Sequence, residues 1–200
     1  MRCRKWFAEL SFSFCSLYAR VAKKPFAVEK AAVMPYRAQF EQWVPVLLEK
    51  AFPFFADPNN LPRIMPAWLD VRIEEATIVP PPESPSSGFA GSGSRLVASY
   101  RVVPFLPLRI HSEAQIVAFA INEFFEDIQG KGPFRRWHHR HEFAAETRNA
   151  IAGTRLRDQI EYEIGFEPLG AIVNAFFIAP QIRRTFAYRQ QAVERLLVGA

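Results

Sequence analysis

The alternating side chains of residues 134–143 place the strongest constraint on how this chain can fold. The segment follows Gly132-Pro133, a pair that interrupts regular structure, and it contains three of the chain's four histidines. In a β-strand, successive side chains point to opposite faces of the sheet. One face would carry Trp137, His139, His141 and Phe143, and the other Phe134, Arg136, His138, Arg140 and Glu142. The pattern predicts a strand whose inner face lines a semi-polar pocket and whose outer face meets water.

The chain from residue 34 onward is predicted to form one α+β domain with a curved antiparallel sheet. Tyr36–Val44 is the first expected strand, followed by two short helices over Val46–Phe55 and Leu61–Ile64. Further strand-like runs lie near Leu69–Val79, Arg95–Val103, Leu108–Phe119, Phe124–Gln129, Phe134–Phe143 and Thr154–Ile164. Their short connections favour pairing of consecutive strands, which gives an antiparallel sheet of about six to seven strands.

A long C-terminal helix, starting at Pro168-Leu169-Gly170, is expected to lie across the concave face of the sheet and to enclose an apolar space. Its apolar stripe comprises Ile172, Phe176, Ala179, Ile182, Phe186, Val193 and Leu197. Its polar side is expected to carry Arg183, Arg184, Arg189, Gln190, Glu194 and Arg195. Pro180 removes an internal hydrogen bond, so a kink or break is expected near Phe177–Pro180.

The positive charge of the chain is confined to its first 33 residues. The formal net charge is +5, and all of it comes from residues 1–33, because basic and acidic residues balance from Met34 onward. A nucleic-acid-binding domain normally carries a basic field over its folded body. The balanced charge therefore argues against nucleic acid as a partner.

Residues 1–33 are open to several interpretations. Arg2, Arg4 and Lys5 precede an apolar stretch, as in a secretory signal, but Glu9 and several serines interrupt that stretch and no clean cleavage site follows. A weak contact with a membrane surface is a second interpretation. The favoured one is a loosely ordered extension, or translation starting at Met34, on a cytoplasmic protein. No apolar run is long enough to span a bilayer.

Residues 80–94 are rich in Pro, Ser and Gly. Such a composition buries little apolar surface, which favours a mobile extension of a hairpin. The alternative is a flap over the mouth of a cavity, since long loops sometimes serve as lids.

A series of short motifs after residue 34 resembles the START-like (SRPBCC) superfamily, which includes lipid-transfer domains and polyketide cyclase/dehydrase-like proteins. The motifs are Phe52-Pro53-Phe54-Phe55-Ala56-Asp57-Pro58-Asn59-Asn60-Leu61, residues 125–134, residues 137–143, Asp158-Gln159-Ile160-Glu161-Tyr162, Gly165-Phe166-Glu167-Pro168-Leu169-Gly170 and Phe186-Ala187-Tyr188-Arg189. The chain departs from the family pattern in residues 1–33, in the 80–94 insertion and at residues 119–122. The resemblance implies a helix-grip fold over 34–200 that binds a hydrophobic or amphipathic ligand.

Asp158 is the most conspicuous polar residue on the predicted inner face. In the last strand it alternates with Leu156, Ile160, Tyr162 and Ile164. An inward carboxylate is costly unless it is paired, and His139 or His141 on the neighbouring strand is a natural partner. The pair has three interpretations: a buried structural contact, an anchor for the headgroup of a ligand, or a catalytic acid and base.

No cofactor and no metal site are predicted. The sequence contains no phosphate loop or glycine-rich fingerprint, and Cys3 and Cys15 have no metal-ligand spacing. His139 and His141 at i, i+2 can share a metal, but a stable site needs three or four converging ligands. His111 follows the strand phase of Arg109, which is expected to face solvent.

The sequence therefore favours a carrier or binding protein for a lipid or polyketide-like molecule. The alternatives are a cyclase- or dehydratase-type enzyme, with His139, His141 and Asp158 as candidate catalytic residues, and a module that regulates a partner protein. The residues predicted to contact the ligand are Trp137, His139, His141, Phe143, Asp158, Tyr162, Ile172 and Phe176. Ile172 and Phe176 are expected to face Trp137 and Tyr162 across the cavity.

Overall fold

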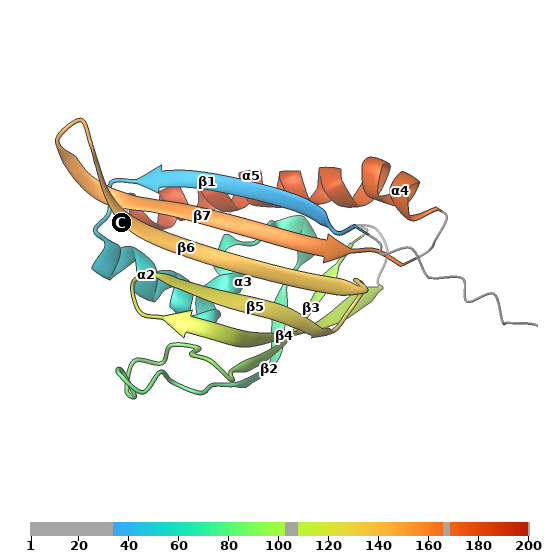
Figure 1. Cartoon of the computed structure of the whole chain (residues 1–200), viewed down its shortest axis with the longest axis horizontal. Coiled ribbons are helices and arrows are strands. Elements are labelled where there is room, and N and C mark those ends of the chain that lie inside the picture. The colour runs from blue at the N-terminus through green and yellow to red at the C-terminus, as the bar shows by residue number, and fades with distance from the viewer. Residues whose placement is uncertain (1–33, 103–107, 166–168, 200) are drawn as a thin grey trace, which may run out of the picture. The chain divides into compact units, whose positions relative to one another are not determined.

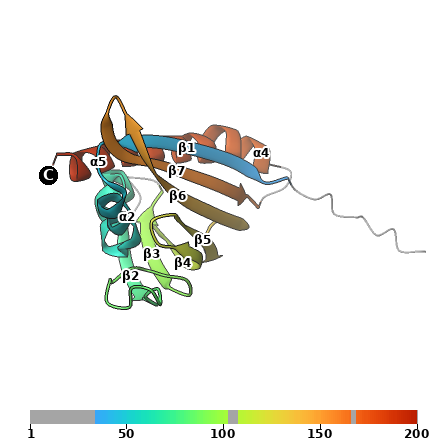
Figure 2. The same ribbon diagram turned by 60° about the vertical axis from the view of Figure 1, so that its left-hand side comes forward.

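The computed structural model describes residues 34–102, 108–165 and 169–199, within one compact unit that begins at Met34. A single seven-stranded antiparallel sheet has the order β1-β7-β6-β5-β4-β3-β2. The strands are β1 (Tyr36–Val44), β2 (Arg72–Thr77), β3 (Arg95–Arg101), β4 (Arg109–Ala120), β5 (Phe124–Lys131), β6 (Arg136–Arg148) and β7 (Ile151–Glu163). Figures 1 and 2 show the sheet curving between its two edge strands, β1 and β2. The predicted α+β helix-grip fold is confirmed.

Strand register brings the inner-face residues into rows that cross the sheet. His141 of β6 lies opposite Phe125 of β5 on one side and Asp158 of β7 on the other. In the neighbouring row, His139 lies between Asp127 and Ile160. Residues directly opposite each other in antiparallel strands have neighbouring side chains on the same face. The register alone therefore gathers two histidines and two aspartates on the concave side.

Short helices close one end of the concave face. They are α2 (Leu48–Ala56), α3 (Leu61–Ile64) and the 3₁₀ turns η1 (Pro58–Asn60) and η2 (Ala67–Leu69). Phe52 of α2 is completely buried and makes edge-to-face contacts with Phe119, Phe125 and Phe143 of the sheet. Such tilted aromatic pairs are favourable beyond the surface that they bury. This aromatic cluster fixes α2 on β4, β5 and β6.

The C-terminal helix runs alongside β1 in three continuous parts (Figure 1). They are α4 (Gly170–Val173), the π-helical η3 (Asn174–Ile178) and α5 (Ala179–Leu197). The irregularity predicted near Pro180 takes the form of this wider π turn directly before the proline, which has no N–H to continue the regular ladder. Pro168, the expected helix start, lies outside the described residues. No helix in the described part of the chain is long and apolar enough to cross a membrane.

The predicted apolar stripe is correct for α5 and wrong for the turns before it. Ile182 and Phe186 are buried, whereas Ile172 and Phe176 are 55% and 72% exposed. The predicted stripe steps by three residues from Phe176 to Ala179 and again to Ile182. Because each α-helical residue turns about 100°, two such steps rotate the stripe by roughly 120° in the same direction. Ile172 and Phe176 therefore do not face Trp137 and Tyr162.

The Pro/Ser/Gly-rich segment between β2 and β3 is held against the domain. The Ala90 N–H donates to the carbonyl of Ala56, and the Gly93 N–H donates to that of Ile116. Phe89 packs against Phe52, with ring centroids 6.2 Å apart. One aromatic side chain and a few backbone hydrogen bonds thus secure residues 89–93, the last part of this segment, and the mobility expected of the segment stays a prediction.

We expect Met34–Ala200 to fold without residues 1–33, because both core clusters of the described residues are built from residue 36 onward. Deletion of residues 1–33 should leave a single cooperative thermal transition, measured by circular dichroism and compared with the full chain. Loss of the transition would contradict this expectation. The predicted loose extension over 1–33 itself lies outside the described residues.

Candidate functional site

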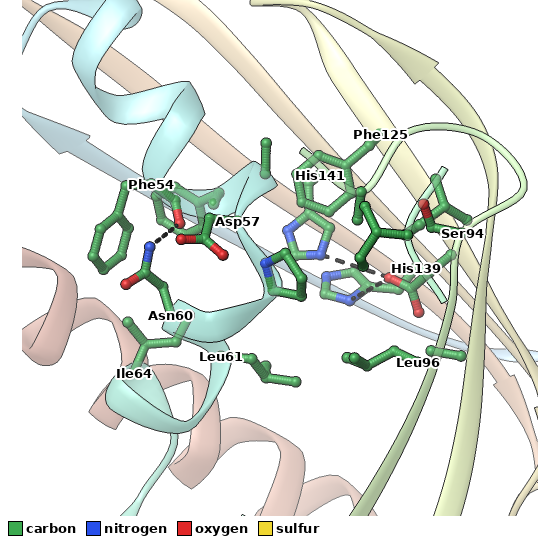
Figure 3. Close-up of a pocket in the computed structure, with 18 of the residues that line it drawn as sticks. Phe54, Asp57, Asn60, Leu61, Ile64, Ser94, Leu96, Phe125, His139 and His141 are labelled. Atoms are coloured by element: carbon green, nitrogen blue, oxygen red, sulfur yellow. Dashed lines mark hydrogen bonds and ion pairs between the residues drawn. The ribbon is translucent and has the colours of Figure 1, made fainter. Parts of the chain in front are cut away.

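Two adjoining cavities lie between the sheet and the helices. The larger, of about 410 Å³, extends between the sheet and the C-terminal helix, and the smaller, of about 180 Å³, extends toward α2 and α3. The residues that line both are Leu61, Leu96, Ala114, Asp127, His139 and Arg189. These residues mark the boundary between the cavities, which we call the waist. Figure 3 shows the smaller cavity between Leu61 of α3 and Leu96 of β3.

The larger cavity is mostly apolar. Its apolar lining includes Met65, Leu69, Val71, Ala98, Tyr100, Val102, Ile110, Phe134, Trp137, Ile164, Val173, Ile178, Ile182 and Phe186. Leu96, Ala98 and Tyr100 alternate along β3, which directs every second side chain inward, and Val102 follows the end of the strand. A space of this size and character is typical of a site for a small organic molecule.

Two buried histidines and two partly buried aspartates form a cluster at and beside the waist. One carboxylate oxygen of Asp158, Oδ1, lies 3.0 Å from His139 Nε2 and 2.7 Å from His141 Nδ1. Asp127 Oδ2 lies 3.6 Å from His139 Nδ1 and 3.7 Å from His141 Nε2. The two imidazole rings are 3.8 Å apart between centroids, and Figure 3 shows them side by side near Phe125. Each carboxylate is therefore shared by both rings.

The two imidazoles have pKa values displaced in opposite directions. Burial lowers the pKa of His139, and the positive charge of His141 lowers it further. Burial also opposes protonation of His141, but the charge of Asp158 and hydrogen bonds to Asp127 and Asp158 raise its pKa above the usual value. Burial alone would raise the pKa of Asp158, yet the charge of His141 and hydrogen bonds from both histidines hold it well below its ordinary range. His141 is therefore the more readily protonated of the two imidazoles.

Arg189 of α5 adds a positive charge at the waist. Its side chain is buried, and its guanidinium lies over the ring of Phe186, 4.7 Å from the centroid. Its charge lowers the pKa of Asp127 and of Asp158, as the smallest of several contributions. The waist and the residues beside it thus combine two carboxylates, two imidazoles and an arginine.

Three of the eight predicted ligand-contacting residues line a cavity: Trp137, His139 and His141. Asp158 lines neither cavity, and it contacts His139 and His141 from the side away from the cavities. Phe143 is part of the buried core around Phe52. The Tyr162 hydroxyl donates to Asn174 Oδ1 at 2.8 Å, and its ring belongs to a second core cluster. The expected positions of Phe143 and Tyr162 were wrong, because the same inner face supplies both the packed core and the cavity wall.

Sequence reasoning missed the acidic and the basic residue of the waist, Asp127 and Arg189. Asp127 alternates with Phe125 and Gln129 along β5, a period-two signal equivalent to the one that revealed Asp158. Arg189 was assigned to the polar side of the helix, although it lies three residues after Phe186 and four before Val193. Helical spacing within the apolar stripe would have placed it inside.

The described residues include one group with metal-ligating potential, formed by Asp127, His139 and His141. Each offers one ligand atom, and these atoms lie within 4.8 Å of one another. The same atoms are engaged in mutual ion pairs, and the raised pKa of His141 favours the protonated form, which has no lone pair for a metal. His111 is exposed on β4 and lies apart from the group, as its strand phase predicted.

Comparison with known families identifies the fold and its family. The sequence profile of the family described as polyketide cyclase/dehydrase and lipid transport matches residues 44–187, most of the chain. The chain belongs to this family. The match includes β1's last residue, the whole remaining sheet and α5 through Ala187. No curated protein matches the sequence significantly.

Solved structures of very low sequence identity share the fold of this family member. TTHA0849 from Thermus thermophilus is 13% identical, with a TM-score of 0.55 over 82% of this chain and 98% of that protein. Ara h 8.0201 is 12% identical, with a TM-score of 0.56 over 83% and 99%. A START superfamily protein from Mycobacterium smegmatis is 14% identical, with a TM-score of 0.53 over 80% and 98%. These likenesses establish the architecture.

Replacing Asp158 by Asn should destabilise the protein by about 1–3 kcal/mol, the usual cost of disrupting a buried polar contact. The substitution keeps the shape of the side chain but removes the charge shared by His139 and His141. Thermal or urea unfolding measures the effect. Glu161→Gln is the matched control, because Glu161 lies on the outer face of β7 in an exposed pair with Arg37. Equal effects of the two substitutions would contradict the importance of the buried cluster.

The destabilisation by Asp158→Asn should also depend on pH. The pKa of His141 is raised in the folded state, so its contribution to stability is complete below the unfolded pKa of about 6.5 and is lost as pH rises through the raised value. The pKa of Asp158 is lowered, so its contribution is present above about 3.9 and is lost as pH falls through the lowered value. The difference between wild type and variant should be largest at about pH 4–6.5. A difference that grows above pH 8 would refute this assignment.

Proposed function

We propose that the protein binds a hydrophobic or amphipathic small molecule, lipid-like or polyketide-like, in the two adjoining cavities. The observation that carries the proposal is the apolar larger cavity, which extends from Trp137 on the sheet, and Ile164 just after β7, to Ile182 on α5. Burial of apolar surface gives roughly 25 cal/mol per Å², so such a lining favours a mostly apolar occupant. Membership of a family described by polyketide cyclisation and lipid transport supports this choice.

The polar waist supports an occupant with one polar end. His139 and Arg189 line both cavities, so a molecule lying in the larger cavity would place that end against them. A few polar groups in an otherwise apolar site normally fix the orientation of a ligand. The waist then acts as an anchor, and the apolar walls supply most of the binding free energy.

One observation favours general acid–base catalysis as a second candidate function. The neighbouring imidazoles of His139 and His141 have pKa values displaced in opposite directions, which provides a base beside an acid. Both rings line the smaller cavity. Mass spectrometry of the bound molecule before and after incubation distinguishes the functions. An unchanged mass supports binding alone, whereas conversion that is lost in His141→Asn supports catalysis.

Filling the larger cavity should abolish uptake of an apolar dye. Ala98 of β3 points into this cavity, so Ala98→Phe should reduce the affinity for Nile red by about tenfold or more while leaving the fold intact. Fluorescence titration measures the affinity, and thermal unfolding checks the fold.

Val97→Phe is the matched control for this test. Val97 is the next residue on the same strand and points to the opposite face, away from both cavities. Its substitution should leave dye affinity unchanged within about twofold. The proposal is contradicted if wild type takes up no dye, or if both variants bind it as wild type does.

A further inference from the structure

The inner face of α5 carries a row of hydrogen-bond donors along the larger cavity. Gln181, Thr185 and Arg189 are four residues apart, a spacing that places them on one side of a helix. All three line the larger cavity, and Thr185 and Arg189 are buried. The row runs from Arg189, at the waist, along the larger cavity to Gln181. A purely apolar ligand would leave these donors without acceptors.

The guanidinium of Arg189 has unused donors. Among the described residues, it makes no ion pair and no side-chain hydrogen bond. Asp127 and Asp158, whose pKa values the charge of Arg189 lowers, are instead engaged by the two histidines. Burying a charged group without a hydrogen-bonded partner is expensive, and a planar guanidinium matches a carboxylate in a bidentate arrangement. A hydrogen-bond acceptor on a ligand in the cavity would therefore stabilise these N–H groups.

Gln181 provides a second, independent indication. Its Nε2 is buried and has no acceptor among the residues that the structure describes. Eight residues of α-helix separate Gln181 from Arg189, a rise of about 12 Å. An unsatisfied buried donor costs free energy comparable to a lost hydrogen bond. Gln181 lines the larger cavity, and a rotation of its side chain toward that cavity would let a ligand oxygen accept from Nε2 and remove the cost.

The charges around the waist limit the ligand to a single negative charge. The groups facing Arg189 are Asp127 from β5, His139 and His141 from β6, and Asp158 from β7. Asp127 and Asp158 already place two carboxylates near the guanidinium of Arg189. A dianion such as a phosphate monoester would bring two further negative charges close to these carboxylates in a site largely shielded from water. A carboxylate adds only one and matches the guanidinium geometry.

We propose that the ligand is an elongated amphipathic carboxylic acid whose carboxylate is bound by Arg189, and whose chain follows α5 with an oxygen near Gln181. The inference rests on the proposed function and specifies the chemical class of its ligand. The apolar chain fills the larger cavity, and the Arg189 N–H groups donate to both carboxylate oxygens. Thr185 lies between the two polar contacts and can donate to a further oxygen.

The test measures displacement of Nile red from the full-length protein by decanoate and by decanamide, its uncharged counterpart. Decanoate should bind at least about tenfold more tightly, because a charge-assisted bidentate contact contributes more than a neutral one. In Arg189→Met the two should bind within about twofold of each other. Arg184→Met, an exposed arginine on the same helix, should keep the wild-type preference.

The outcomes separate failure of the proposed function from failure of this inference. Absence of Nile red binding overturns the proposed function. Binding of the dye together with equal displacement by decanoate and decanamide overturns the inference alone, and this comparison needs only wild type. A preference for decanoate that persists in Arg189→Met also overturns it.

A second ligand pair tests the contact at Gln181. The hydroxyl of extended 10-hydroxydecanoate lies about 12 Å from its carboxylate, the rise between Arg189 and Gln181. It should displace the dye about two- to tenfold better than decanoate in wild type, the gain from one net hydrogen bond. Gln181→Leu should abolish this gain and keep the preference for decanoate over decanamide. An equal gain in both proteins would overturn the placement along α5.

Discussion

The pairing of β6 with β7 along thirteen residues is the constraint on which the site depends. It places His141 beside Asp158 and His139 beside Ile160, and β5 extends both rows with Phe125 and Asp127. Because strand side chains alternate with period two, a register shift of one residue would move one partner of each pair to the outer face. The polar cluster is therefore as well defined as the sheet itself.

The polar waist lies between two regions of apolar packing. On one side, Phe52 and its aromatic neighbours fill the concave face, and on the other, Tyr162, Ile182 and Phe186 form a second cluster. Neither cluster extends across the middle of the sheet, where the two cavities meet. Buried polar groups require partners, and four of the five ionisable groups at the waist find them within the cluster. Arg189 is the one of the five for which the described residues provide no ion pair or side-chain hydrogen bond.

The sequence predicted the sheet well because period-two alternation depends on local geometry alone. The same logic correctly brought His139, His141 and Asp158 together. It failed to separate cavity from core, since Phe143 and Tyr162 share the inner face with Trp137 and only tertiary packing determines which side chains remain beside empty space. It also misplaced Ile172 and Phe176, because small errors in helical phase accumulate over successive turns and the helix widens in η3, which contains Phe176 and separates Ile172 from α5. Arg189 was overlooked because its charge assigned it to the polar side of the helix, although its spacing from Phe186 and Val193 places it within the apolar stripe.

The strand order also affects how the chain completes its fold during synthesis. Strands β2 to β7 pair with their neighbours in sequence, so each hairpin forms from contacts that are local along the chain. Strand β1 is made first, yet its sheet partner is β7, the last strand to be made. Contacts between distant segments form slowly because a long loop must close first. The hairpins from β2 to β7 can therefore assemble before β1 pairs with β7. The helix α5 is translated after all the strands. A nascent chain that stops after β7 already carries His139, His141, Asp127 and Asp158 on its sheet. It lacks α5, the helix that covers these residues and encloses the larger cavity.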